Sequence, residues 1–107
     1  MTFQVKLLPR AALQLHESAL WWAERHSTVQ AVEWLERFEA ALRSLAQDPD
    51  RWNLAAESAI VGLDIREMTF GMKRTKTHRA VFGIRHNEVI VYAIRHLAQD
   101  QLTADDF

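Results

Sequence analysis

Apolar residues recur at two different spacings along the chain, and each change of spacing marks a predicted element. Residues 2–8 alternate between apolar and polar side chains, which predicts a short strand. From Pro9 to about His26 the spacing becomes three and four residues, which predicts a helix. Pro9 suits the first helical turn, because the N–H that proline lacks has no partner there in any helix. The apolar stripe of this helix comprises Ala12, Leu13, Leu15, Ala19, Leu20 and Trp22.

A second helix is predicted directly after the first. Ser27 and Gln30 form a Ser-x-x-Gln capping pattern, which closes one helix and opens the next. The turn at Asp48-Pro49 ends the second helix, because the residue before a proline is pushed out of the helical region. Two helices joined by so short a link form an antiparallel hairpin. The core stripe expected here is Ala31, Leu35, Phe38, Leu42 and Leu45, and the other face carries Glu33, Glu36, Arg37 and Arg43.

The second half of the chain is predicted to form a sheet. Residues 51–61 are irregular, residues 71–77 form a basic loop, and the polar tail is either a short helix or irregular. The order is therefore strand, helix, helix, strand, strand, strand, in one α+β domain over residues 1–107. The helical hairpin is expected to pack on a small, mainly antiparallel sheet. The three strands expected after the helices are residues 62–70, 78–85 and 88–96.

The last two strands are predicted to pair through a two-residue turn at residues 86–87. Without a bulge, Arg79 lies diagonally near His96 on one face, and His78 stands opposite Arg95 on the other. The helices can cover only one face, so the second apolar face must meet a loop, a partner chain or the C-terminal tail. The expected pairs are Gly83 with Ile90, Val81 with Tyr92 and Arg79 with Ile94.

Charge is distributed unevenly along the chain. Residues 66–96 hold seven cations against two acids, a net +5, and the remainder holds six cations against twelve acids, a net −6. This split predicts a basic surface that meets an anionic partner, and its alternative is a solvated basic hairpin beside acidic helices. A planar guanidinium suits phosphate or carboxylate. The predicted anion- or target-binding residues are Arg66, Lys73, Arg74, Lys76, His78, Arg79 and Arg95.

Two of these arginines also have a structural interpretation. Arg79 could pair with Glu67, and Arg95 could pair with Asp100. In that case both side chains serve the fold rather than a ligand, and the residues alone leave the choice open.

Several classes of protein are excluded by composition. There is no cysteine, so disulfides and thiolate metal sites are ruled out. The five histidines lack metal-ligand spacing, and no metal or cofactor is expected. No apolar run approaches the ~20 residues of a membrane span, and there is no signal peptide pattern, so a cytoplasmic protein is expected.

Two adjacent tryptophans stand out on the first helix. Trp21 and Trp22 point about 100° apart on a helix, so one of them is expected near the surface. That side chain is a candidate partner contact.

The chain resembles the RelE/ParE toxin superfamily of type II toxin–antitoxin modules, often labelled plasmid stabilisation proteins. The similarity spans nearly the whole chain, from "LPRA" through the "DP" turn and "REMTFGMKR" to the final strands. Its most specific parts are "HRAVF" at residues 78–82 and "IRHLAQD" at residues 94–100. The resemblance implies a small α+β toxin in the cytosol, neutralised by a cognate antitoxin in a hetero-oligomer.

The resemblance implies two possible targets. RelE-like members are metal-independent nucleases that cut mRNA on the ribosome, and ParE-like members inhibit DNA gyrase. The long helical hairpin is more similar to the ParE side, and Leu97, Ala98 and Gln99 stand where many nucleases have a further histidine, tyrosine or arginine. Gyrase is therefore the favoured target, the ribosome-bound mRNA is the alternative, and an inactive toxin-like binding module is the third possibility.

The nuclease alternative assigns roles by similarity to that superfamily. Arg79 matches the family arginine that holds the scissile phosphate, and Arg95 matches an arginine near the end of the last strand. His96 or His78 would be the general acid, and Glu57 or Glu67 would be the general base. The catalytic set under this alternative is Arg79, Arg95 and His96.

Overall fold

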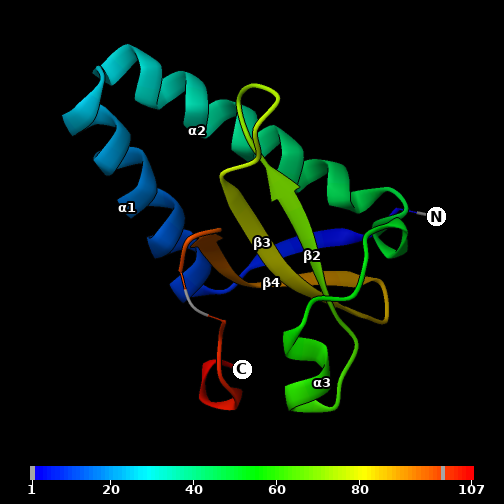
Figure 1. Ribbon diagram of the computed structural model, residues 1–107. Coiled ribbons are helices and arrows are strands. Elements are labelled where there is room, and N and C mark those ends of the chain that lie inside the picture. The colour runs from blue at the N-terminus through cyan, green and yellow to red at the C-terminus, as the bar shows by residue number, and fades with distance from the viewer. Residues whose placement is uncertain (1, 100) are drawn as a thin grey trace.

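A helical hairpin lies across one face of a four-stranded sheet in the computed structural model, which describes residues 2–99 and 101–107 (Figure 1). The predicted order and the α+β class are confirmed, and a short helix lies within the segment that was predicted to be irregular. Among the described residues, no helix is long and apolar enough to cross a membrane. The elements are β1 (Gln4–Leu7), α1 (Pro9–Arg25), α2 (Thr28–Arg43), α3 (Glu57–Val61), β2 (Ile65–Phe70), β3 (His78–Arg85) and β4 (Glu88–His96), with 3-10 turns at Ser44–Ala46, Pro49–Arg51 and Ala104–Asp106.

Local signals in the sequence set the bounds of the hairpin. The Ser27 side chain caps α2 by accepting a hydrogen bond of 3.1 Å from the backbone N–H of Gln30. Pro9 occupies the first turn of α1, as predicted. Asp48, the residue before Pro49, takes a left-handed conformation with φ of 47° and turns the chain toward the sheet.

The sheet has the strand order β1-β4-β3-β2. The pairs β2–β3 and β3–β4 are antiparallel, and β1 joins β4 in parallel. The sheet is therefore mainly antiparallel, as predicted, and β4 lies between β1 and β3. The parallel pair requires the long connection that the two helices supply.

The predicted register of β3 and β4 is wrong beyond the middle of the hairpin. Gly83 pairs with Ile90 as expected, but the register shifts between Val81 and Phe82, so that Tyr92 is the extra residue of a bulge. Because side chains alternate along a strand, one extra residue in β4 moves each later side chain of that strand to the opposite face of the sheet. The observed partners are Val81 with Ala93, Arg79 with Arg95, and His78 with His96.

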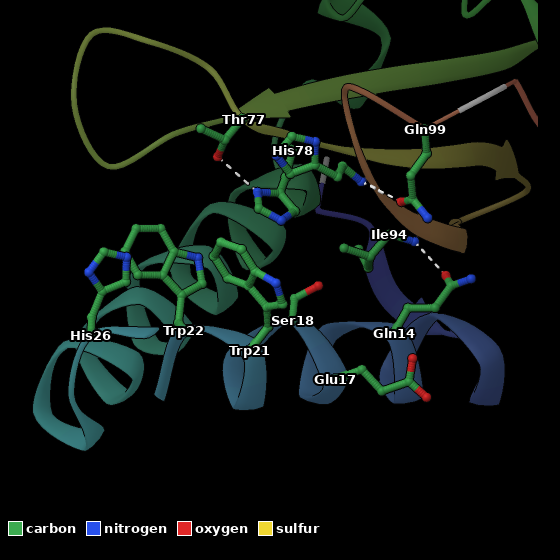
Figure 2. Close-up of a pocket in the computed structure, with 11 residues that line it drawn as sticks. Gln14, Glu17, Ser18, Trp21, Trp22, His26, Thr77, His78, Ile94 and Gln99 are labelled. Atoms are coloured by element: carbon green, nitrogen blue, oxygen red, sulfur yellow. Dashed lines mark hydrogen bonds between the residues drawn. The ribbon is translucent and has the colours of Figure 1, made fainter. Parts of the chain in front are cut away.

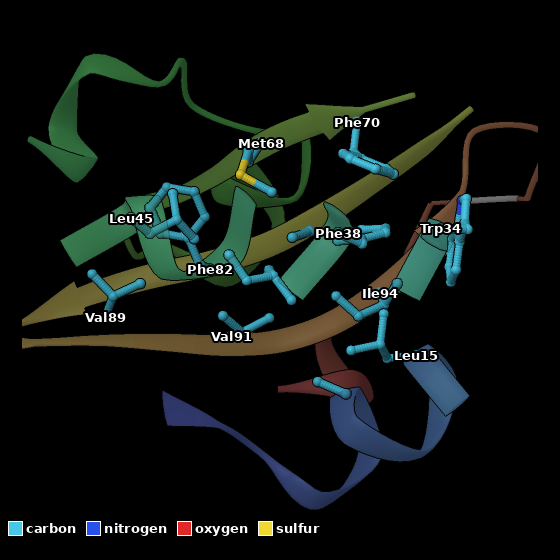
Figure 3. Packing of buried hydrophobic residues seen from close by; sticks show 13 residues of the cluster. Leu15, Trp34, Phe38, Leu45, Met68, Phe70, Phe82, Val89, Val91 and Ile94 are labelled. Carbon is cyan, nitrogen blue, oxygen red and sulfur yellow. The ribbon is translucent and has the colours of Figure 1, made fainter. Parts of the chain in front are cut away.

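The main core fills the space between the hairpin and one face of the sheet (Figure 3). Phe38 of α2 lies at its centre, with its ring 4.3 Å from that of Phe70 and 5.3 Å from that of Trp34. The predicted stripe of α2 is buried except for Leu35, which is half-buried. On α1 the stripe is narrower than predicted, because Leu13 and Leu20 are exposed.

The second face of the sheet is covered by α3 and the C-terminal tail. Leu102 inserts among these apolar side chains, and Phe107 packs its ring edge-on, 5.1 Å from the ring of Tyr92. An ion pair of 3.0 Å between Arg10 and Asp106 ties the tail to α1. The sequence predicted that a loop, a partner chain or the C-terminal tail would cover this face. In the structure it is covered by the tail together with the segment that contains α3. The buried residues of this smaller cluster are Ala55, Ile65, Val81, Ala93 and Leu102.

Truncating a core side chain of α2 should be costly. Leu42 is 3 % exposed, so Leu42→Ala is expected to lower the free energy of unfolding by about 2–5 kcal/mol through a cavity that the surroundings fill only partly. Leu20→Ala, at a position that is 64 % exposed on α1, serves as the control and should change it by about 0.5 kcal/mol or less. Urea unfolding of both variants measures the difference, and equal losses would contradict the described packing.

Candidate functional site

Arg79, the central residue of the predicted anion site, lies in a buried cluster of charges. Its side chain on β3 is held between Glu57 of α3 and Glu67 of β2. Nη1 donates to Glu57 Oε1 at 3.0 Å and to Glu67 Oε2 at 3.1 Å, and Nη2 donates to Glu57 Oε2. The pair with Glu67 is the structural interpretation of Arg79, and Glu57 adds a second carboxylate that the sequence did not assign to it.

Glu57 is fully buried and remains ionised. The hydrogen bond from Arg79 is the largest influence, and it lowers the pKa of Glu57 from 4.5 to about 2 against the opposing effect of burial. Hydrogen bonding to Glu57 likewise raises the pKa of Arg79. Glu57 Oε2 also accepts a hydrogen bond of 3.0 Å from the backbone N–H of Leu102 in the tail. A carboxylate so strongly stabilised in its charged form is a weak general base at neutral pH.

His78 and His96 pair at the same end of β3 and β4, next to Arg79 and Arg95 in the sequence. His78 is 6 % exposed, and burial, followed by repulsion from His96, lowers its pKa to about 4. It is therefore neutral near pH 7 and carries no charge for an anion. Its Nδ1 lies 2.8 Å from Thr77 Oγ1, and its ring lies 5.0 Å from that of His96.

The bulge determines the surroundings of His96 and Arg95. His96 is exposed, and its Nδ1 accepts a hydrogen bond of 3.0 Å from the backbone N–H of Ala98, which leaves Nε2 to carry the proton in the neutral ring. Arg95 lies on the opposite face, paired in register with Arg79. It contributes, after the larger effect of the Thr103 backbone, to lowering the pKa of Asp106. Its predicted partner Asp100 lies outside the described residues.

The remaining predicted cations divide into an internal one and an exposed group. Arg66 Nη1 donates to the backbone carbonyls of Asp50 at 3.1 Å and Trp52 at 2.5 Å, so it ties β2 to the preceding turn. The structure therefore does not assemble the seven predicted residues into one surface. The exposed cations of the set are Lys73, Arg74 and Lys76.

A groove of about 510 Å³ lies between α1 and the ends of β3 and β4. Figure 2 shows Trp21, Trp22 and His26 rising from α1 toward His78 on the opposite wall. The expectation that one tryptophan lies near the surface is confirmed, because Trp21 is 47 % exposed and Trp22 is partly buried. The groove as a whole was missed by sequence reasoning, since its walls come from segments far apart in the chain.

The groove is lined by two tryptophans and Ile94 together with histidines and other polar side chains. The Trp22 ring stacks on His26 at 4.3 Å and meets Trp21 edge-on at 6.1 Å. Gln14 also lines the groove, and its Oε1 accepts a hydrogen bond of 2.8 Å from the backbone N–H of Ile94. An apolar cavity with a few fixed polar groups is the usual form of a binding site. No cluster of three possible metal-binding side chains occurs within residues 2–99 and 101–107.

Comparisons with known proteins agree with this architecture. The family described as "ParE toxin of type II toxin-antitoxin system, parDE" matches residues 5–101. A solved chain from the chromosomal ParDE TA system from P. aeruginosa has the same fold, with a TM-score of 0.72 at 16 % identity over 89 % of this chain and 96 % of that chain. No curated protein matches the sequence.

These matches define the toxin component of a type II toxin–antitoxin system, whose partner is an antitoxin. The chain belongs to the ParE toxin family. The resemblance seen in the sequence is thereby confirmed on its ParE side.

Removing the charge of Glu57 should destabilise the protein. Glu57→Gln keeps the shape of the side chain but leaves the buried Arg79 with one charged partner, Glu67, and we expect the free energy of unfolding to fall by about 3 kcal/mol at pH 7. Because folding lowers the pKa of Glu57 from 4.5 to about 2, its contribution is complete above pH 4.5 and disappears as the pH falls toward 2. As the pH falls from 4.5 toward 2, the free energy of unfolding should therefore decrease less in Glu57→Gln than in the wild type.

Thermal melts from pH 7 to pH 2 measure this effect. Glu67→Gln is the matched control, because Glu67 binds the same arginine with a side chain that is 34 % exposed. Glu67→Gln should lower the free energy of unfolding by about 1 kcal/mol or less. If both variants melted alike at every pH, the central role of Glu57 would be refuted.

Proposed function

We propose that this toxin acts by binding DNA gyrase in the cytoplasm, as the resemblance to ParE-like members implies. Membership of the ParE family supports the proposal. A toxin of this kind needs a surface complementary to its target rather than a set of catalytic groups. The antitoxin would then neutralise it by competing for that surface or by changing its shape.

The observation that favours binding over RNA cleavage is the environment of Arg79. A nuclease needs a cation at the scissile phosphate, which must be accessible to RNA. The Arg79 side chain is 9 % exposed, and its guanidinium is held by two carboxylates. His78 is neutral at pH 7, and Glu57 is a weak base. We therefore assign Arg79, Glu57 and Glu67 to the architecture of the second sheet face.

Of the catalytic set under the nuclease alternative, His96 is exposed, Arg95 is half-buried and Arg79 is buried. His96 lines the groove, and the ring nitrogen that remains for a ligand is Nε2. One histidine beside an aromatic wall does not supply the acid, base and phosphate-binding cation that strand cleavage requires. We retain mRNA cleavage as the outcome that would replace gyrase inhibition.

We propose that the aromatic groove receives an apolar side chain of the antitoxin. Trp21, Trp22 and Ile94 supply an apolar surface, and His26, Glu17 and Gln99 supply polar groups at the opening. Interfaces concentrate their binding energy in such central aromatic pockets. The second sheet face, which the sequence left open to a partner, is occupied by the tail of the same chain.

Supercoiling by purified gyrase should be inhibited by the purified toxin, and addition of the antitoxin should restore it. The same preparation should leave ribosome-bound mRNA intact, because Arg79, the cation assigned to the scissile phosphate, is buried between two carboxylates. A His96→Gln variant is the control: it should inhibit gyrase as well as the wild type does. Intact supercoiling combined with His96-dependent cleavage of mRNA would replace the proposal by the nuclease.

Trp21→Ala should weaken antitoxin binding by about 30-fold, which corresponds to the loss of a hot spot of about 2 kcal/mol. Leu63→Ala is the control, because Leu63 is 55 % exposed and lies beside α3 rather than in the groove. Isothermal titration with the antitoxin encoded by the neighbouring reading frame measures both. Equal affinities of the two variants would exclude the groove as the antitoxin site.

A further inference from the structure

The loop between β2 and β3 carries the highest density of exposed positive charge in the described part of the chain. We call residues 71–77 the basic loop; it contains Lys73, Arg74 and Lys76 and no acidic residue. All three side chains are exposed. Within residues 2–99 and 101–107, none of the three makes an ion pair or a hydrogen bond. Their charges are therefore available to a partner.

The backbone of the basic loop is fixed rather than open. Its ends are joined by a hydrogen bond of 2.9 Å from Thr77 N to Phe70 O. Gly71 packs so closely on the chain that an added Cβ would lie 2.1 Å from Thr75 O, which no side chain could accommodate. Met72 packs against the main core. The three cations are thus presented from a preorganised turn, which lowers the entropy that a ligand must overcome.

An acidic side chain of α2 lies near the loop. Glu33 of α2 lines a shallow cavity together with Lys73, but it already forms an ion pair of 3.1 Å with Arg37 on the next helical turn. That arginine lines the same cavity. The positive field of the loop is therefore not cancelled by the helix beside it.

The kind of partner follows from what the loop lacks. It has no aromatic residue, and its one large apolar side chain, Met72, is turned into the core. Protein interfaces need a desolvated apolar centre, and single-stranded nucleic acids need aromatic platforms on which bases stack. Contacts to the phosphates of a duplex need only cations held at fixed positions.

We propose that the basic loop binds the phosphate backbone of double-stranded DNA through Lys73, Arg74 and Lys76. This binding is a property of the toxin itself and does not depend on the proposed action on gyrase. In a gyrase–DNA complex it would add a second attachment beside the enzyme surface. Because only phosphates are contacted, the binding has no preference for sequence.

Fluorescence anisotropy with a labelled duplex of mixed sequence tests the proposal on the purified toxin. If the loop makes three phosphate contacts, affinity should fall by about 40-fold between about 50 and 200 mM salt. The triple variant Lys73→Gln, Arg74→Gln and Lys76→Gln should lose nearly all of that binding. It should keep the wild-type melting temperature, since all three side chains are exposed.

A triple variant with the same change in charge is the control. Arg43→Gln, Arg51→Gln and Arg85→Gln replace three exposed cations outside the loop and should retain the salt dependence of the wild type. Equal losses in the two triple variants would reduce the effect to net charge and overturn the proposal. So would tighter binding of single-stranded RNA than of duplex, or loss of antitoxin affinity in the loop variant with unchanged DNA binding. The anisotropy assay contains no gyrase, so a failure of the toxin to inhibit gyrase would leave the DNA-binding result unchanged.

Discussion

The pair formed by Glu57 and Arg79 is the constraint around which the second face of the sheet is built. A charge with no access to water is tolerated only when its partners are fixed, and here each partner belongs to a different element. Glu57 comes from α3, Arg79 from β3 and the Leu102 backbone from the tail. The short helix and the tail therefore depend on each other, through this polar cluster as well as through the apolar side chains that they share. Glu67 extends the same cluster to β2.

The internal use of charge changes the meaning of the basic half of the sequence. Residues 66–96 carry a formal net +5, but Arg66 and Arg79 are held by acceptors of the same chain. A guanidinium with several donors is well suited to this task, because it can satisfy backbone carbonyls or two carboxylates at once. The charge that faces solvent is consequently concentrated on the basic loop.

The sequence predicted what depends on local periodicity and missed what depends on a single residue or on distant contacts. The two helices, their cap at Ser27 and the order of the strands follow from repeated patterns, and these are confirmed. The bulge at Tyr92 does not, because an apolar residue between apolar neighbours looks the same whether it is paired or extruded. Because of that one residue, His78 pairs with His96 and Arg95 pairs with Arg79, whereas the sequence placed His78 opposite Arg95. Glu57 was proposed only as a base, since its helix of five residues is too short to show a period.

The place of β4 in the sheet has a consequence for synthesis. Gln4 of β1 pairs with Glu88 of β4, so β1 can join the sheet only after β4, which follows it by about 80 residues, has been synthesised. A chain interrupted between the end of α2 and residue 88 has the helical hairpin but lacks β4, the strand that lies between β1 and β3. Contacts so distant in sequence form slowly, and only after β4 has been synthesised. Premature termination before residue 88 thus releases fragments that cannot form the toxin's sheet.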